Sequence, residues 1–573
     1  SSNINGLPES TINITIDGVN VQNNDNKSTD GYFTYVRPRI DAIEEVTVST
    51  ATPGAESSGE GAVQIKFVTR SGNNEFHGSI YEYHRDWGLN ANYWFNNRDV
   101  RPRTDPFDPT KFLDDPKTFK APRDRLILNQ YGFRVGGPFR FPKKLFGPFA
   151  FDGRDKAFFF VNYEEYYLPN SINRTRTVLH PRAQQGFIRY IYTDPQTGAR
   201  SIREVDVLDL ARRNNQLATV DPTIAKLLTD IRAATGARGS VEIQEDPNRV
   251  TNPIQQRYVF PNFDVERRYF PTTRLDFNLT NKHHLETTYN YQRFGNVALF
   301  NGIDPAFPGF PNHGAQHSHR YSSATALRST LTPTLVNEAR FGFSGGPSFV
   351  NENVGRDVFT GPLANQAGFN LGASPGTGST GIAAALGING ATISTTGTRG
   401  NTMAYQFNDT LSWTRGAHNL NFGVSFTQIS DYGISKASVP TINFGVDAND
   451  PAAAMFSAQN ASVNFPGAAS ADITRARNLY GVLTGRVTSI AASANLNEKT
   501  NQYEYQGLYT TRARQREMGF FAQDSWRMRP NLTLTLGLRY ELEFPFLALN
   551  NAYSFTSVDD LFGVSGPGNL FKP

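Results

Sequence analysis

The sequence predicts an all-β transmembrane protein, built as part of an antiparallel β-barrel in an outer membrane. Segments of alternating apolar and polar residues recur along the chain, and the connections between them are alternately long and short. No run approaches the ~18 consecutive apolar residues of a spanning helix. The predicted strands are 76–85, 129–136, 156–166, 271–280, 283–293, 321–331, 335–345, 404–414, 418–428, 516–528 and 531–543. The long connections are 86–128, 167–270, 294–320, 346–403 and 429–515.

This alternation of connections distinguishes a barrel from a soluble β-sandwich. Outer-membrane barrels have short periplasmic turns and long extracellular loops. Four of the five remaining connections have only two or three residues, as in Asn281-Lys282 and Arg529-Pro530. A soluble sandwich has no reason to collect every long loop at one end, so we expect the long connections outside the cell.

The last predicted strand shows the alternation most clearly. One face carries Leu532, Leu534, Leu536, Leu538, Tyr540 and Leu542. Arg539 and Glu541 lie on the other face, and moving Arg539 to the lipid side would cost about 2–4 kcal/mol near the midplane. The same pattern sets Phe341 and Phe343 against Arg340. Aromatic residues expected in the interfacial girdles are Tyr163, Tyr166, Trp413, Trp526 and Tyr540.

Composition excludes several classes of protein. The 573 residues contain no cysteine, so disulfides and thiolate metal sites are excluded. The net charge of +4 results from 56 basic and 52 acidic groups. The sequence has no stripe of basic residues of the kind that indicates nucleic-acid binding. A mean hydropathy of −0.46 fits a barrel, in which only alternate strand residues face lipid.

The two ends of the chain predict that it is a piece of a larger protein. The first residues have neither the charged nor the apolar region of a signal peptide. Eleven strands leave the last one ending outside, whereas single-chain bacterial barrels have even counts. We therefore expect residues 76–573 to be the N-terminal half of a barrel.

Residues 1–75 do not show the barrel pattern. Short predicted strands at 12–19, 39–49 and 63–69 are separated by an Asp-Gly turn and a glycine-rich break. A small mixed α/β domain directly before a large barrel suggests a plug. We expect 1–75 to be the C-terminal part of such a domain.

Several motifs resemble a known family. Asp17-Gly18-Val19, Ile43-Glu44-Glu45-Val46, and the run 64–79 with Arg70 and Gly72 resemble the second half of a TonB-dependent receptor plug and the first barrel strand. The resemblance is to the Oar-like branch, whose members carry an N-terminal carboxypeptidase-regulatory-like domain. Segments 129–138, 155–165 and 520–526 also resemble that branch. Thr47 stands where many plugs carry a second Glu, so that residue's ion-pair role is not transferred.

The resemblance implies a barrel of ~22 strands closed by its plug. It implies a bacterial outer-membrane receptor that imports a large or scarce solute: a glycan, a peptide or a siderophore. Its partners would be membrane lipid, the extracellular solute, and a TonB-type energy-transducing protein acting through a segment not in this chain. An adhesion or assembly protein with the same barrel is the alternative. A passive porin and a hydrolase fit less well.

Few residues predict specific chemistry. No catalytic or cofactor-binding arrangement is found, and substrate-binding residues stay unknown. Asp447, Asn449 and Asp450 are weak calcium candidates. His283 and His284 are adjacent in a strand, so they face opposite ways and do not share a metal. A helix is expected at 221–234, with Asp221 as N-cap, Pro222 at the first position and Gly236 just past the end.

Overall fold

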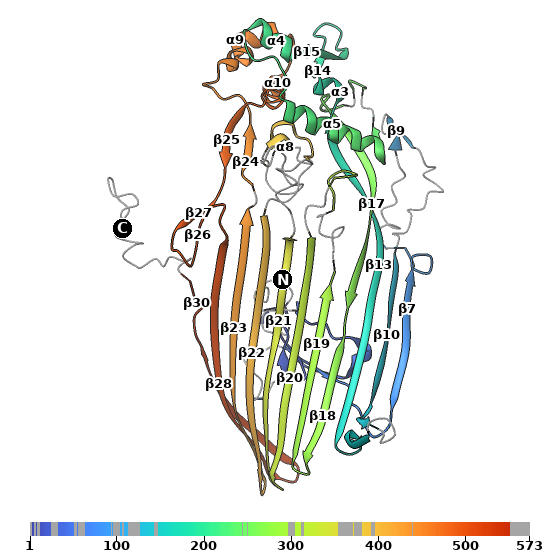
Figure 1. Cartoon of the computed structure of the whole chain (residues 1–573), viewed down its shortest axis with the longest axis vertical. Helices are drawn as coiled ribbons and strands as arrows, with labels where there is room; N and C mark the ends of the chain where they lie inside the picture. The colour runs from blue at the N-terminus through green and yellow to red at the C-terminus, as the bar shows by residue number, and fades with distance from the viewer. Residues whose placement is uncertain are drawn as a thin grey trace, which may run out of the picture.

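A computed structural model describes residues 12–23, 32–50, 63–92, 126–141, 147–242, 245–248, 250–295, 304–310, 315–352, 381–390, 396–437 and 439–550, with a few shorter pieces between them. Three groups of elements make up this structure: a large antiparallel sheet, a small N-terminal sheet, and a cap of helices and hairpins (Figure 1). Within the described residues, no helix is both long and apolar enough to span a membrane.

The main sheet contains all eleven predicted strands. Its strands follow one another in space almost as in sequence, and every pairing between them is antiparallel. The strands are β7 (His77–Asp86), β10 (Ile127–Pro138), β13 (Ala157–Leu179), β17 (Gln255–Tyr269), β18 (Thr272–Thr280), β19 (His283–Phe294), β20 (Ala315–Thr332), β21 (Leu335–Glu352), β22 (Thr396–Arg415), β23 (His418–Ala437), β28 (Tyr509–Arg529) and β29 (Leu532–Glu543). The short strands β16 (Ser240–Glu242) and β30 (Leu547–Ala548) complete fourteen.

Strand β17 corrects one prediction. The expected loop 167–270 is partly sheet, because β13 continues to Leu179 and β17 returns beside it from Gln255. Proline cannot donate to a sheet ladder and normally argues against a central strand. Here Pro169 and Pro261 both lie inside the paired region, which is why the sequence pattern missed it. Strands β17 and β18 follow one another along β13, with a break at Phe270 and Pro271.

Most strands of the main sheet are longer than a membrane crossing requires. A spanning strand needs about 9–11 residues, whereas β13 has 23 and β28 has 21. Four turns at the opposite end remain two residues long, at 281–282, 333–334, 416–417 and 530–531. The extra length therefore projects from the end predicted to face the cell exterior (Figure 1).

The two faces of the sheet differ as the alternation predicts. Leu536, Leu538 and Phe341 are exposed on the outer face, with 68%, 76% and 50% of their surface accessible. The inner face carries buried polar residues such as Asn290 and Gln292. Tyr166 was wrongly assigned to the outer girdle: it shares the inner face with Glu164, and its ring lies against the Arg268 guanidinium. Within the described residues, β7 and β29 are each paired on one side only.

The N-terminal sheet lies against the inner face of the main sheet (Figure 1). It has four strands in the order β4 (Val19–Asn20), β3 (Ile12–Ile16), β6 (Val63–Thr69) and β5 (Ile43–Ser49). β3 and β6 run parallel, and the one-turn helix η2 (Ile40–Ala42) leads into β5. Its core is small: Ile12, Ile14, Ile16, Val21, Val36 and Val63.

The cap covers the long-loop end. It contains α3 (Pro181–Gln184), β14 (Phe187–Thr193), β15 (Arg200–Asp206), α4 (Val207–Arg213), α5 (Pro222–Ala237), α8 (Gly381–Leu386), β24 (Thr441–Phe444), η4 (Pro451–Phe456), α9 (Ala458–Asn464), α10 (Ser470–Leu483) and β25 (Val487–Ala491). The hairpin β26 (Ala494–Leu496) and β27 (Tyr503–Tyr505) follows. Helix α5 confirms the predicted N-cap, since the Asp221 carboxylate accepts from the amides of Thr223 and Ile224. Gly236 lies inside its last turn rather than beyond it.

Smaller elements complete the described structure: β1 (Asn3–Ile4) with β2 (Leu7–Pro8), β8 (Thr104–Asp105) with β9 (Asp108–Phe112), β11 (Arg140–Phe141) with β12 (Phe151–Asp152), and the helix η3 (Gly147–Phe149).

Candidate functional site

The candidate site is the inner face of the main sheet where the N-terminal sheet contacts it. The turn between β3 and β4 is central. Asp17 and Gly18 have φ angles of 48° and 78°, a region that glycine adopts readily and other residues rarely. The Asp17 carboxylate accepts from the amide and hydroxyl of Thr69, both at 2.9 Å. It thereby ties the turn to the end of β6.

Two arginines of the main sheet hold this turn. Arg274 donates to the carbonyl of Thr69 at 3.0 Å, and one guanidinium nitrogen lies 3.8 Å from the Asp17 carboxylate. Arg340 donates to the Asp17 carbonyl. A Cβ on Gly18 would meet only the movable end of the Arg340 side chain, so it is the positive φ of Gly18 that favours glycine there.

Carboxylates of the main sheet, which is called the wall from here on, hold the same arginines in place. Asp276 binds Arg274 through both oxygens at 3.0 and 3.1 Å, and Glu286 binds it at 2.7 Å. Glu338 accepts from Arg340 at 2.5 Å. Burial of paired charges stabilises little, but removal of one partner leaves the other uncompensated. Loss of either partner would therefore weaken the contact.

Amide groups continue the contact further along the wall. Gln406 accepts from the Asn20 amide and donates to its carbonyl, both at 3.0 Å. Gln292 makes the equivalent pair with the Arg37 backbone, at 3.0 and 2.6 Å. Gln523 accepts from the Ala55 amide at 2.8 Å. Side-chain amides of the wall thus bind backbone groups of the N-terminal domain.

An arginine cluster lies toward the long-loop end of this contact. It consists of Arg37 and Arg39 from the N-terminal domain and Arg268 and Arg320 from the wall. Strand β19 runs from the short turn at His283 to the long-loop end at Phe294, and the Arg320 guanidinium lies 4.3 Å from the Phe294 ring centre. The guanidinium of Arg268 lies 4.9 Å from the same ring. The cluster is therefore on the outer side of the turn at Asp17.

Positive charge exceeds negative charge in the arginine cluster. Arg39 pairs with Glu164, and Arg268 pairs with Glu266. Arg320 donates one hydrogen bond to the Ser318 hydroxyl at 3.1 Å, and one of its terminal nitrogens is buried without a partner in the described structure. Burial, followed by the charges of Arg268 and Arg39, lowers the pKa of Arg37. Stacking on the Phe294 ring partly offsets the cost of burying these positive charges. A bound anion would offset more of that cost.

The remaining residues of the motifs that resemble a plug have separate environments. Gly72 passes the short-turn ends of β10 and β13, where a Cβ would lie 2.4 Å from the Phe159 carbonyl oxygen and 2.8 Å from that of Gly137. The Arg70 amide donates to the Ala42 carbonyl at 2.9 Å. Glu44 and Glu45 are exposed on β5, where Glu45 accepts from the Thr47 hydroxyl. Only Asp17, Gly18 and Gly72 are therefore at the wall through contacts that the structure describes.

The calcium candidates have other partners. Asp447 accepts from the amides of Asn449 and Asp450, which forms a turn. Both Asp450 oxygens accept from Arg486 at 2.6 Å, and one also caps η4. Arg486 therefore uses both Asp450 oxygens, and the turn uses one Asp447 oxygen. The calcium site stays a prediction.

Another acidic group surrounds Arg274. Asp276, His284 and Glu286 place one potential ligand atom each within 4.8 Å of one another. Arg274 already neutralises both carboxylates, and His284 bonds to Asn278 at 2.8 Å. The two carboxylates therefore already have a cationic partner.

The alternation pattern placed Arg340 on the polar face but assigned it no role. It also gave no role to Arg268, Arg274 and Arg320. The available signal was arginine at inner-face positions of neighbouring strands. This arginine pattern indicates a site only when the strand register is known, because the register places Arg274 beside Glu286 and Arg320 beside Gln292.

The cap contains one continuous apolar core. Four connections supply it: those from β13 to β17, β19 to β20, β21 to β22, and β23 to β28. Its fully buried members include Ile188, Phe307, Ile382, Leu479 and Tyr480. The long loops thus fold as one unit above the site.

Comparison with known proteins gives the family. Residues 68–569 match the family described as "Outer membrane beta barrel domain". No curated protein matches the chain.

Solved structures of similar fold include the outer membrane transporter YddB from Escherichia coli, with 10% identity over 95% of this chain and 50% of that one, at a TM-score of 0.44. The siderophore receptor PirA from Acinetobacter baumannii is 11% identical over 93% and 49%, with a TM-score of 0.40. A mutant ferric enterobactin receptor PfeA from Pseudomonas aeruginosa, in complex with enterobactin, is 11% identical over 93% and 50%, with a TM-score of 0.39. The chain spans about half the length of these structures.

With most of its length matched, the chain belongs to the outer membrane β-barrel domain family, and its place is the bacterial outer membrane.

Proposed function

We propose that this chain is part of an energised importer, in which residues 1–75 belong to a plug and residues 76–573 to the barrel wall. The observation that carries this proposal is the polar contact between the two. Arg274 and Arg340 bind the Asp17 turn by hydrogen bonds and charge. Such a contact holds a closed state, yet it can be exchanged for water when a partner pulls on the plug.

The arginine cluster suggests the class of solute. It lies on the outer side of the plug contact, carries surplus positive charge, and retains an unpartnered nitrogen on Arg320. An anionic group on the solute would satisfy it. We propose that the imported solute carries a carboxylate, phosphate or similar anion, and that a TonB-type partner supplies the work.

Conductance of the intact protein in planar bilayers tests the plug. We expect little conductance in the intact protein, and a large increase after deletion of residues 1–75. Arg274→Met should give intermediate, fluctuating conductance, because it removes the contacts with Thr69 and Asp17. A steadily open intact pore would contradict the proposal.

Energised import needs a separate measurement. Periplasmic solutes are profiled by mass spectrometry in cells with and without the intact gene, each with and without a protonophore. We expect anionic solutes that accumulate only with the gene and disappear with the protonophore. Accumulation that persists with the protonophore would contradict energised transport.

The folded cap favours a second candidate, a surface adhesion or assembly protein. A packed apolar core such as that around Leu479 and Tyr480 gives the cap a fixed outer surface, which suits stable binding of another surface. Cell adhesion that is unchanged by the protonophore, together with no gene-dependent solute, would support this candidate instead.

A further inference from the structure

One connection at the short-turn end departs from the two-residue pattern. Residues 139–156 join β10 to β13, and their described parts fold against the outer face of the main sheet. Strands β11 and β12 pair Arg140 with Asp152 and Phe141 with Phe151. The Phe139 amide donates to the Ala157 carbonyl at 2.9 Å, and the Asn278 amide donates to that of Lys156 at 2.7 Å. The connection is thus fixed to both β13 and β18.

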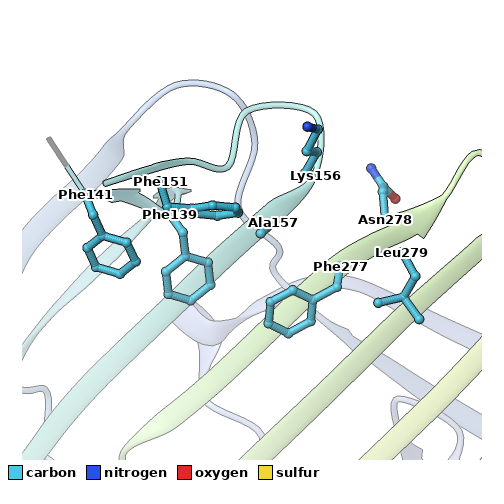
Figure 2. A pocket seen from close by; sticks show the side chains of 8 residues that line it. All are labelled: Phe139, Phe141, Phe151, Lys156, Ala157, Phe277, Asn278 and Leu279. Atoms are coloured by element: carbon cyan, nitrogen blue, oxygen red, sulfur yellow. The ribbon is translucent and has the colours of Figure 1, made fainter. Parts of the chain in front are cut away.

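An open cavity of about 430 Å³ lies between this connection and the sheet (Figure 2). Known ligand pockets measure about 300–1,000 Å³. Half of its eight lining residues are phenylalanines, and the rings of Phe139 and Phe277 stack with centres 6.1 Å apart. The full lining is Phe139, Phe141, Phe151, Lys156, Ala157, Phe277, Asn278 and Leu279.

The pocket faces lipid at the level of the periplasmic leaflet. Phe277 and Leu279 belong to the outer face of β18, and Leu279 is 56% exposed. Thr280 ends β18 and Ala157 begins β13, so the pocket lies at the short-turn end of both strands. The pocket is therefore continuous with the membrane-facing surface of the barrel.

A cation stands at the rim of this apolar pocket. Figure 2 shows Lys156 on the connection itself, with the phenyl rings below it. Asp152 is held by Arg154 at 2.6 Å and lies 4.0 Å from Arg140. Asp155 accepts from the Asn74 side chain at 2.6 Å. Among the described residues, no carboxylate forms an ion pair with Lys156.

We propose that this pocket binds one acyl chain of a phospholipid from the periplasmic leaflet, with the Lys156 ammonium at the lipid phosphate. The acyl chain enters from lipid rather than from water, so burial of apolar surface adds little driving force. The cation should decide how long the lipid stays, because a Lys near the membrane surface changes binding of an anionic headgroup by about five-fold. A bound lipid would complete the packing of Phe141 and Phe151.

Photolabelling of the intact protein in vesicles tests this proposal. The vesicles contain a phosphatidylglycerol with a diazirine at the end of one acyl chain, and the labelled peptides are mapped by mass spectrometry. We expect labelling at Phe139, Phe141 and Phe277 several-fold above that at Phe341, an exposed outer-face residue on β21, three strands from β18 in the same sheet. Equal labelling of all lipid-facing aromatics would overturn the proposal, as would a pocket that stays unlabelled because another molecule fills it.

Variants separate the phosphate contact from general lipid exposure. Lys156→Gln should lower pocket labelling about five-fold, whereas Lys282→Gln, in the two-residue turn at 281–282, should leave it unchanged. Leu279→Trp fills the pocket and should lower labelling while Lys156 is retained. A diacylglycerol with the same photoreactive chain but no phosphate should label the wild-type pocket weakly and Lys156→Gln equally weakly. Strong labelling by diacylglycerol would overturn the assignment of Lys156, and heat-modifiable migration on gels confirms folding of each variant.

Discussion

The N-terminal sheet and the cap both contact the main sheet, but through opposite chemistry. The N-terminal sheet meets the wall through arginines, carboxylates and side-chain amides, as at Arg274 and Gln406. The cap is held by an apolar core in which Leu479 and Tyr480 are fully buried. Opening an apolar core exposes its side chains to water, which costs the full free energy of their burial. Opening a polar contact costs less free energy, because water replaces the hydrogen bonds that are broken. The comparison identifies the N-terminal contact as the one suited to reversible opening.

Loss of Arg274 should give the largest effect. The variant Arg274→Met leaves the buried carboxylates of Asp17 and Asp276 without their cation, and removal of one partner of a buried pair costs about 3–5 kcal/mol. We expect amide exchange in β6 to accelerate by at least about 100-fold, since each 1.4 kcal/mol is ten-fold. Hydrogen exchange of residues 63–69 in the intact protein measures this.

Arg328→Met is the matched control. Arg328 pairs with Glu338 on the same wall but is 64% exposed, and exposed pairs contribute about 0–1 kcal/mol. Similar acceleration in both variants would show that the contact with the N-terminal sheet does not depend on Arg274.

A cavity in the cap should give the next largest effect. Leu479→Ala removes a fully buried side chain from α10, at a cost of about 2–5 kcal/mol. The chain contains no cysteine, so a single Ala476→Cys substitution reports opening of the cap through its rate of maleimide labelling. We expect Leu479→Ala to raise this rate at least about 30-fold and to leave exchange in β6 unchanged.

Val463→Ala controls for the loss of an aliphatic side chain, because Val463 is 77% exposed on α9. If Leu479→Ala accelerated exchange in β6 as strongly as Arg274→Met, the two regions would form one cooperative unit. The N-terminal contact would then not open independently of the cap.

A smaller effect is expected at Gly72, which joins the N-terminal sheet to β7. A Cβ there would meet the carbonyl oxygens of Phe159 and Gly137, and overpacking of this kind costs about 1–3 kcal/mol. Gly72→Ala should lower the thermal midpoint for loss of the N-terminal contact. Gly400→Ala in β22, where a Cβ meets nothing within 4 Å, should not, and equal shifts in both variants would contradict the close approach.

Some of the structural features behind these predictions can be predicted from the sequence, and others cannot. The strands followed from period-two alternation, which is local, and so did the polar face that carries Arg340. Strand β17 was not predicted because Pro261 locally disfavours a strand. In the folded chain, pairing of β17 with β13 overrides that local preference. The N-cap at Asp221 was readable because capping depends on neighbouring residues alone.

The cap core and the arginine cluster were not readable. Phe307, Ile382 and Leu479 come from three different connections and meet only in the folded chain. Arg37 and Arg320 are likewise brought together by docking of the N-terminal domain on the wall, as the contact of Gln292 with Arg37 shows. No periodicity within one segment reports such encounters.

The smallest expected effect is a pH dependence of the cap. His180 caps α3 by accepting from the Arg182 amide through Nδ1, while Nε2 bonds to Glu245 at 3.0 Å. Burial, followed by the charge of Arg189, lowers the pKa of His180, although Glu245 opposes the change. The unfolded chain therefore binds more protons than the folded cap just below pH 6.5, the ordinary pKa of histidine, and stability in that window falls as pH falls.

We expect the cysteine at position 476 to become more reactive toward maleimide between about pH 6.5 and 5.5, measured as a ratio to a cysteine placed at exposed position 463. His180→Gln should remove this dependence, because a neutral amide does not titrate. His77→Gln, which changes a histidine with a 65% exposed ring on β7, should keep it. Protection of the β6 amides from hydrogen exchange should not change over this pH range in the wild type or in either histidine variant, since His180 belongs to the cap alone. A shared window would mean that protonation of the cap loosens the N-terminal contact as well, and that the two chemistries are coupled through the wall.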